Sequence, residues 1–74
     1  MEEKLKKIFV DLFNFHDLQD HITRDDIPDW DSMRHLSLIL EIEKEFDLSL
    51  SIEDSIHMVS IKAIKEIISE HGAI

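Results

Sequence analysis

The sequence has no cysteine among its 74 residues, and it has no long apolar run. Without thiols, neither a disulfide framework nor a thiolate metal site is available. No window approaches the roughly 18 apolar residues that a membrane-spanning helix needs. The opening residues MEEKLKK also lack the apolar stretch of a signal peptide. We therefore expect a cytoplasmic protein with no membrane span.

Glycine and proline are scarce, with one of each. Pro28 interrupts the polar segment 15–31, and Gly72 lies where the C-terminus of a last helix favours glycine. No segment has the alternating pattern of a strand, and no internal repeat is visible. A chain of this length holds one core, so residues 1–74 are expected to form a single domain.

Positive charge is also scarce, because 8 lysines and arginines face 17 acidic residues for a net charge of −9. The excess is concentrated in residues 15–31, where six aspartates accompany Arg24 alone. Such a balance argues against nucleic acid, which is bound through phosphate neutralisation. It favours partners with basic surfaces, unless the acids serve only to keep a small domain soluble.

The apolar residues that are present follow helical spacing. The first stripe runs through Leu5, Ile8, Phe9, Leu12 and Phe13. A broader stripe follows Ser32, and its members are Leu36, Leu38, Ile39, Leu40, Ile42 and Phe46. The last contains Ile61, Ile64, Ile67 and Ile68. These patterns predict helices over about 2–14, 32–46 and from residue 61 onward.

Capping signals add a shorter element. Ser51 with Asp54 forms a capping-box pattern before a short helix near 52–57, and Ser60 offers a cap for the last helix. The connection 15–31 is expected to be held by its apolar residues, which are Leu18, Ile22, Ile27 and Trp30. The predicted fold is all-α, a small four-helix bundle with three main helices, one short third helix and a long first loop.

Catalytic and metal-binding patterns are weak. His35 lies one helical turn after Ser32, but no neighbouring glycine provides the strained turn of a serine nucleophile. The five histidines are scattered. The aspartates after residue 24 resemble a calcium loop, yet Trp30 stands where that loop needs glycine. We expect no enzyme activity and no metal site.

Ser32 attracts attention because it begins the best-defined helix. Both Asp31 and Ser32 are good N-cap residues, and either could serve. A phosphate ester on Ser32 would also suit this position, because the N–H groups and the positive end of a helix favour an anion. The residues themselves leave both alternatives open.

The chain resembles an acyl carrier protein. The resemblance lies in WDSM at 30–33, in the following apolar positions, and in IEKEF at 42–46. It continues through Glu53-Asp54 and VSI at 59–61, so that it covers essentially the whole chain in order. Membership of this family implies an acyl-carrier-like bundle.

The resemblance implies a specific modification. Ser32, in the attachment motif that Asp31 and Met33 complete, would receive 4′-phosphopantetheine from coenzyme A through a phosphopantetheinyl transferase. The thiol of this arm would carry acyl groups as thioesters for fatty-acid biosynthesis, or for specialised polyketide-like or sugar-modifying pathways. The attached chain would lie against residues that could equally be plain core, namely Leu36, Ile39, Leu40 and Ile56.

The resemblance also implies docking with enzymes that load or consume the cargo through basic surfaces. Candidate docking residues are Arg34, His35, Glu41 and Glu43, of which the first two depart from the acidic or neutral residues common in fatty-acid carriers. The chain is expected to be a monomer. Asp-Ser-Met is also similar to D-alanyl carriers, so an aminoacyl cargo is one alternative, and an unmodified interaction module of the same fold is another.

Overall fold

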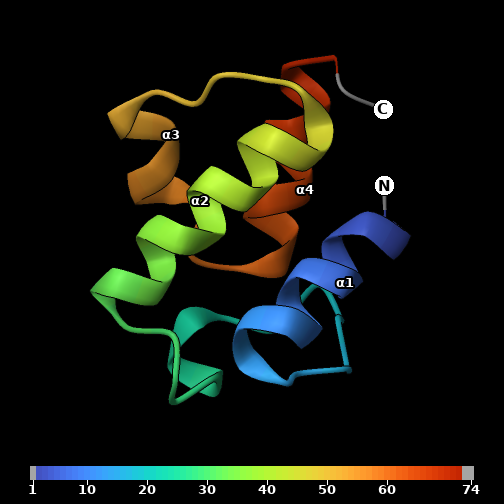
Figure 1. Ribbon diagram of the computed structural model, residues 1–74, viewed down its shortest axis with the longest axis vertical. Helices are drawn as coiled ribbons and strands as arrows, with labels where there is room; N and C mark the ends of the chain where they lie inside the picture. Colours follow the sequence, from blue (N-terminus) through green and yellow to red (C-terminus); the bar gives the residue numbers. More distant parts are fainter. Residues whose placement is uncertain (1, 73–74) are drawn as a thin grey trace.

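The computed structural model describes residues 2–72, which contain four α-helices and no β-strand. They are α1 (Glu2–Phe13), α2 (Ser32–Phe46), α3 (Ile52–His57) and α4 (Ile61–Glu70) (Figure 1). The long connection after α1 contains one turn of 3-10 helix, Arg24–Asp26. The all-α prediction is confirmed, and α1 ends within a residue of its expected limit.

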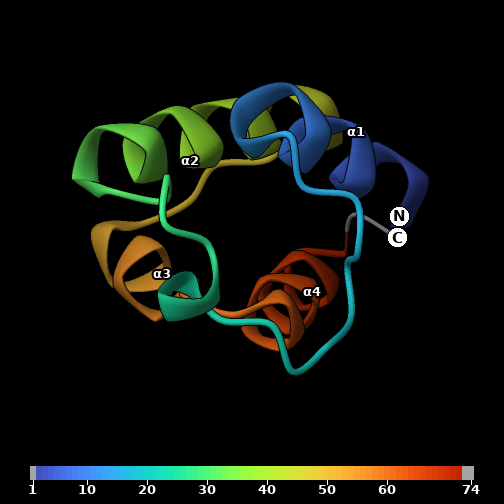
Figure 2. The same cartoon turned by 90° about the horizontal axis from the view of Figure 1, so that it is seen from below.

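The helices lie in two layers. α1 packs against α2, and α3 contacts α4; Figure 2 shows the two pairs facing each other. The long loop leaves α1, passes beside α4 and then turns back to the start of α2. Backbone bonds fix this path, because Ile61 N donates to Ile22 O at 2.9 Å and Arg24 N donates to Val59 O at 2.8 Å.

The core lies between the two layers and draws on three helices, the long loop and Met58 after α3. Its buried members are Leu5, Ile8, Phe9, Phe13, Ile22, Ile27, Trp30, Leu38, Ile39, Ile42, Phe46, Met58, Ile61, Ile64, Ile67 and Ile68. No residue of α3 is buried. The short helix therefore contributes little to the core, and other contacts must hold it in place.

Trp30 fixes the end of the long loop. Its ring is 3% exposed and lies 5.4 Å from the Phe9 ring and 5.6 Å from the Phe13 ring, measured between centroids. Ile22 and Ile27 are also buried, while Leu18 packs at the edge of the core. The predicted anchoring of the loop is confirmed, and it sets the position of the residues that follow Trp30.

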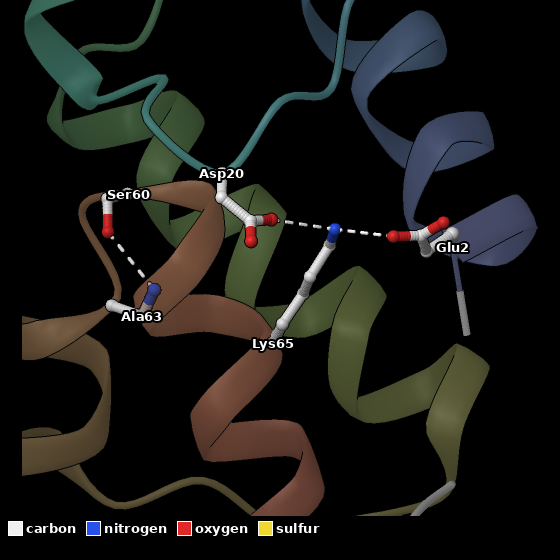
Figure 3. A network of polar contacts seen from close by, with 5 residues as sticks. All are labelled: Glu2, Asp20, Ser60, Ala63 and Lys65. Carbon is white, nitrogen blue, oxygen red and sulfur yellow. Dashed lines mark hydrogen bonds and ion pairs between the residues drawn. The ribbon is translucent and has the colours of Figure 1, made fainter.

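Local backbone chemistry determines where the helices begin and end. Ser51 accepts a hydrogen bond from Asp54 N. Ser60 accepts one from Ala63 N (Figure 3), so both predicted caps are present. Asp47 ends α2 in the left-handed conformation, with φ of 52°. Gly72 has φ of 73°, the conformation for which a helix end favours glycine.

One lysine joins three separate parts of the chain. Lys65 on α4 lies 2.6 Å from the carboxylate of Glu2 on α1 and 2.9 Å from that of Asp20 in the long loop (Figure 3). The hydrogen bonds with Glu2 and then Asp20 raise the pKa of Lys65 above its usual value. This network connects the two ends of the sequence with the loop.

Candidate functional site

The sequence left open whether Asp31 or Ser32 caps α2, and the structure assigns the cap to Asp31. Asp31 has extended backbone angles, and its carboxylate accepts a hydrogen bond of 2.8 Å from Arg34 N, so it is the N-cap of α2. Ser32 is the first helical residue and is exposed. Because Asp31 provides the cap, the hydroxyl of Ser32 is available for chemistry.

A guanidinium of the long loop lies beside that hydroxyl. Arg24 Nη2 lies 3.5 Å from Ser32 Oγ, and Arg24 Nε donates to Trp30 O at 2.9 Å. The guanidinium is therefore held beside the serine. Sequence reasoning missed this contact; the available signal was that Arg24 is the only lysine or arginine between residues 15 and 31.

His35 does not face Ser32. Its Nδ1 accepts a hydrogen bond of 2.9 Å from Trp30 Nε1, and its Nε2 lies 2.8 Å from Ser55 O on α3. An indole N–H only donates and a carbonyl only accepts, so both bonds together require the neutral ring with its hydrogen on Nε2. His35 therefore joins the loop, α2 and α3, and the geometry provides no serine–histidine pair.

Arg34 is also engaged within the molecule. Its Nη1 donates to the carbonyl oxygen of Leu12 in the last turn of α1. A cation at this end of a helix satisfies a free carbonyl and opposes the helix dipole. Arg34 and His35 remain candidates for docking only, and each has a structural contact that a partner would have to share.

A shallow apolar groove of about 250 Å³ separates α2 from α3. All four predicted lining residues meet there, together with apolar residues of the α2–α3 connection and α3: Leu36, Ile39, Leu40, Leu50, Ile52 and Ile56. The alternative that they are plain core is wrong for three of them, because Leu36 is 62%, Leu40 57% and Ile56 64% exposed. Ile39 is buried and forms the floor.

The groove begins close to Ser32. Leu36 follows Ser32 by one helical turn, so the two side chains lie on the same face of α2. Met33 does not line the groove and is 82% exposed beside it. An exposed hydroxyl thus stands at one end of an apolar surface, an arrangement that suits a polar attachment point with an apolar cargo.

The two candidate docking acids lie on different faces. Glu43 is half-buried in the groove wall, where its carboxylate accepts a hydrogen bond of 2.8 Å from Leu50 N. Glu41 is exposed and lines a different depression with Lys7 and Lys44, between α1 and α2. Glu43 is therefore not a free acid on the solvent side of α2, because its carboxylate holds the connection to α3.

A second contact holds the far side of α3. His71 Nε2 lies 3.0 Å from the Asp54 carboxylate. This hydrogen bond, and next the one from the backbone of Ser51, lower the pKa of Asp54. Asp54 also completes the capping box with Ser51, so one carboxylate both begins α3 and joins it to the end of α4.

Histidine and acidic side chains do not gather into a metal-binding set. Among residues 2–72, no group of three or more of them could hold a metal ion. No helix in the same part of the chain has the length and apolarity needed to cross a bilayer.

No protein-family model matches the chain, and no curated protein matches its sequence. The function of the site must therefore be inferred from its own geometry.

Proposed function

We propose that the chain is a phosphopantetheine-dependent carrier protein with Ser32 as its attachment residue. The observation that carries the proposal is the exposed hydroxyl of Ser32, left available by Asp31 and followed along α2 by the apolar groove. The order of helices and the attachment motif agree with an acyl-carrier-like bundle. In this function the protein is a tether and not an enzyme.

The residues present fit the group. Ser32 offers an exposed hydroxyl with Arg24 beside it, and the N–H groups of Ser32 and Met33 lie ahead of the Asp31 cap and the internal ladder of α2, where they can face an anion. On transfer, Ser32 Oγ bonds to the phosphorus of the phosphopantetheine half of coenzyme A. The pyrophosphate bond breaks, adenosine 3′,5′-bisphosphate leaves, and a base of the transferase takes the hydroxyl proton.

The thiol of the arm would then hold the cargo as a thioester, a role that this cysteine-free chain cannot fill itself. The groove of about 250 Å³ provides an apolar surface for the cargo next to the attachment residue. The exposed apolar residues beside the groove, Leu36 and Leu40 on α2 and Ile56 on α3, would contact the cargo or the enzymes that process it. These would be loading and acyl-consuming enzymes with basic surfaces.

The proposal is tested by modification. The purified protein is incubated with coenzyme A and a promiscuous phosphopantetheinyl transferase, and its intact mass is measured. We expect the full mass gain of one phosphopantetheine in the unaltered chain and none in Ser32→Ala. The matched control is Ser37→Ala, an exposed serine on the same helix, which should be modified at the unaltered rate.

An unchanged mass in the unaltered protein would contradict the proposal. That result would favour an unmodified interaction module that binds its partners through the apolar groove between α2 and α3. If modification succeeds, thioesters recovered from cells would distinguish an acyl cargo from an aminoacyl cargo.

A further inference from the structure

We propose that Arg24 binds the phosphodiester formed at Ser32 and so fixes the root of the prosthetic arm; the inference rests on the function proposed above. Arg24 Nη2 already lies 3.5 Å from Ser32 Oγ, the atom that would bond to phosphorus. The oxygens of a phosphate on this atom would fall within reach of the same guanidinium. Arginine suits this role because its planar set of N–H groups matches phosphate oxygens.

The position of the guanidinium is determined before any phosphate arrives. Arg24 N donates to Val59 O at 2.8 Å, and Arg24 Nε donates to Trp30 O at 2.9 Å. Trp30 is itself buried against two phenylalanines of α1. Nε is thus used to hold the side chain, and Nη2 lies on the side of Ser32. A preorganised cation loses little conformational freedom on binding.

The charge of Arg24 is not neutralised by its acidic surroundings. Within residues 2–72 the ion pairs join Lys65 with Glu2 and Asp20, and His71 with Asp54, and none includes Arg24. Two neighbouring carboxylates already serve backbone groups. Asp26 accepts a bond from Thr23 N at 2.8 Å, and Asp31 accepts one from Arg34 N at 2.8 Å.

The charge of the loop favours this contact for an anion at Ser32. The loop that precedes it has six aspartates and a net charge of −5, with Arg24 as its only cation. A phosphodiester adds a further negative charge to this surface. Without Arg24 the phosphate would meet only repulsion from the loop, and screening by salt would relieve that repulsion.

The test compares Arg24→Gln with Arg34→Gln, two variants that each lose one positive charge, of which only Arg24 lies beside Ser32 while Arg34 contacts Leu12 O. Both are loaded with coenzyme A and a transferase, and intact mass verifies complete loading. The phosphorus resonance of the loaded proteins is recorded by NMR, and melting temperatures are measured for loaded and unloaded forms. We expect a displaced phosphorus resonance in Arg24→Gln alone.

The melting temperatures provide a second readout. We expect loading to lower the melting temperature of Arg24→Gln by about 4 °C relative to its change in the unaltered protein, at low salt. The difference should shrink in about 1 M salt. Arg24→Lys keeps the charge but not the planar group, and should be intermediate. In the unaltered protein, the side-chain N–H resonances of Arg24 should shift on loading while those of Arg34 do not.

The outcomes separate the two proposals. If the loaded Arg24→Gln and Arg34→Gln proteins agree in phosphorus resonance and in melting temperature change, Arg24 does not bind the phosphate. If Arg24→Gln fails to fold, unchanged Arg24 resonances on loading of the unaltered protein likewise exclude the contact. Absence of any mass gain in the unaltered protein contradicts the carrier function itself, and this inference with it.

Discussion

At the scale of single residues, the start of α2 depends on which neighbour accepts which N–H group. Asp31 and Ser32 both suit an N-cap, and the extended backbone of Asp31 places its carboxylate on Arg34 N. Ser32 is thereby kept out of the cap and exposed. Trp30, one residue earlier, fixes the backbone that presents them, and its indole N–H bonds to His35.

The bond between Trp30 and His35 leads to a prediction about stability. Trp30→Phe removes the indole donor, and His35→Ala leaves that donor and Ser55 O without their partner. Each change should lower the free energy of unfolding by about 1–3 kcal/mol, because partly buried polar groups lose their bonds. In the double variant the losses should overlap by about 0.5–1.5 kcal/mol. Urea unfolding of all four proteins measures this coupling.

A control pair makes the coupling specific. Trp30→Phe combined with His57→Ala should be additive, because His57 is exposed at the end of α3. Additive losses in the Trp30 and His35 pair as well would mean that their hydrogen bond contributes nothing beyond packing.

Sequence reasoning was sound for these residues only where the signal was local. It identified Ser32 and Asp31 as a pair but could not choose the cap, because both side chains suit the position and the backbone angle decides. It could not place Arg24 beside Ser32, since seven residues of the long loop lie between them and their contact depends on the burial of Trp30. Tertiary contacts of this kind leave no periodic pattern.

At the scale of secondary-structure elements, α3 differs from the other helices. Six residues are too few for a helix that is stable alone, and none of them is buried. Three polar contacts hold it: His35 to Ser55 O, His71 to Asp54, and Glu43 to Leu50 N just before it. α3, which forms one side of the groove, is therefore held in place by hydrogen bonds more than by apolar packing in the core.

The Glu43 contact leads to a prediction at this scale. Glu43→Gln weakens the bond to Leu50 N and should lower the free energy of unfolding by about 1 kcal/mol. It should also speed amide hydrogen exchange in α3 more than in α4. The matched change Glu41→Gln, on the exposed side of the same helix, should alter stability by less than about 0.5 kcal/mol.

The same pair clarifies the docking hypothesis. Because Glu41→Lys leaves the α3 attachment intact, slower loading in that variant would identify a docking face, whereas Glu43→Lys would mix docking with loss of structure. Equal exchange rates in α3 for Glu43→Gln and Glu41→Gln would show that the bond to Leu50 does not hold the groove wall.

Helix limits were predictable, but the division of the broad stripe on α2 was not. Leu38, Ile39 and Ile42 enter the core, whereas Leu36 and Leu40 remain exposed in the groove. The spacing of apolar residues identifies an apolar face of the helix, but it does not show which other element packs against that face. Here the short α3 covers only part of that face, so two of the six residues of the stripe, Leu36 and Leu40, remain exposed in a groove.

At the scale of the whole molecule, few of the charged residues form ion pairs that stabilise the fold. Of the 17 acidic residues, only Glu2, Asp20 and Asp54 take part in ion pairs within residues 2–72. The remaining surface is strongly negative, which favours encounter with basic partners and repels other copies of the chain. Lys65 is the one cation that joins α1, the loop and α4 against this repulsion.

Lys65 therefore leads to a prediction that depends on both salt and pH. Lys65→Met should lower the free energy of unfolding by about 1 kcal/mol at neutral pH and low salt, since its partners are largely exposed. Because the folded pKa of Lys65 is raised, the contribution is complete below its usual value of 10.5 and is lost as the pH rises through the folded pKa. The difference in free energy of unfolding between the unaltered protein and Lys65→Met should thus close in strongly alkaline solution and narrow in about 1 M salt.

Thermal unfolding across pH and salt measures this difference, with Lys62→Met as the control from the exposed face of α4. A difference that does not change with pH or salt would show that the effect comes from packing of the Lys65 aliphatic stem. The ion pairs would then contribute nothing, and apolar packing in the core alone would offset the repulsion between the acidic residues.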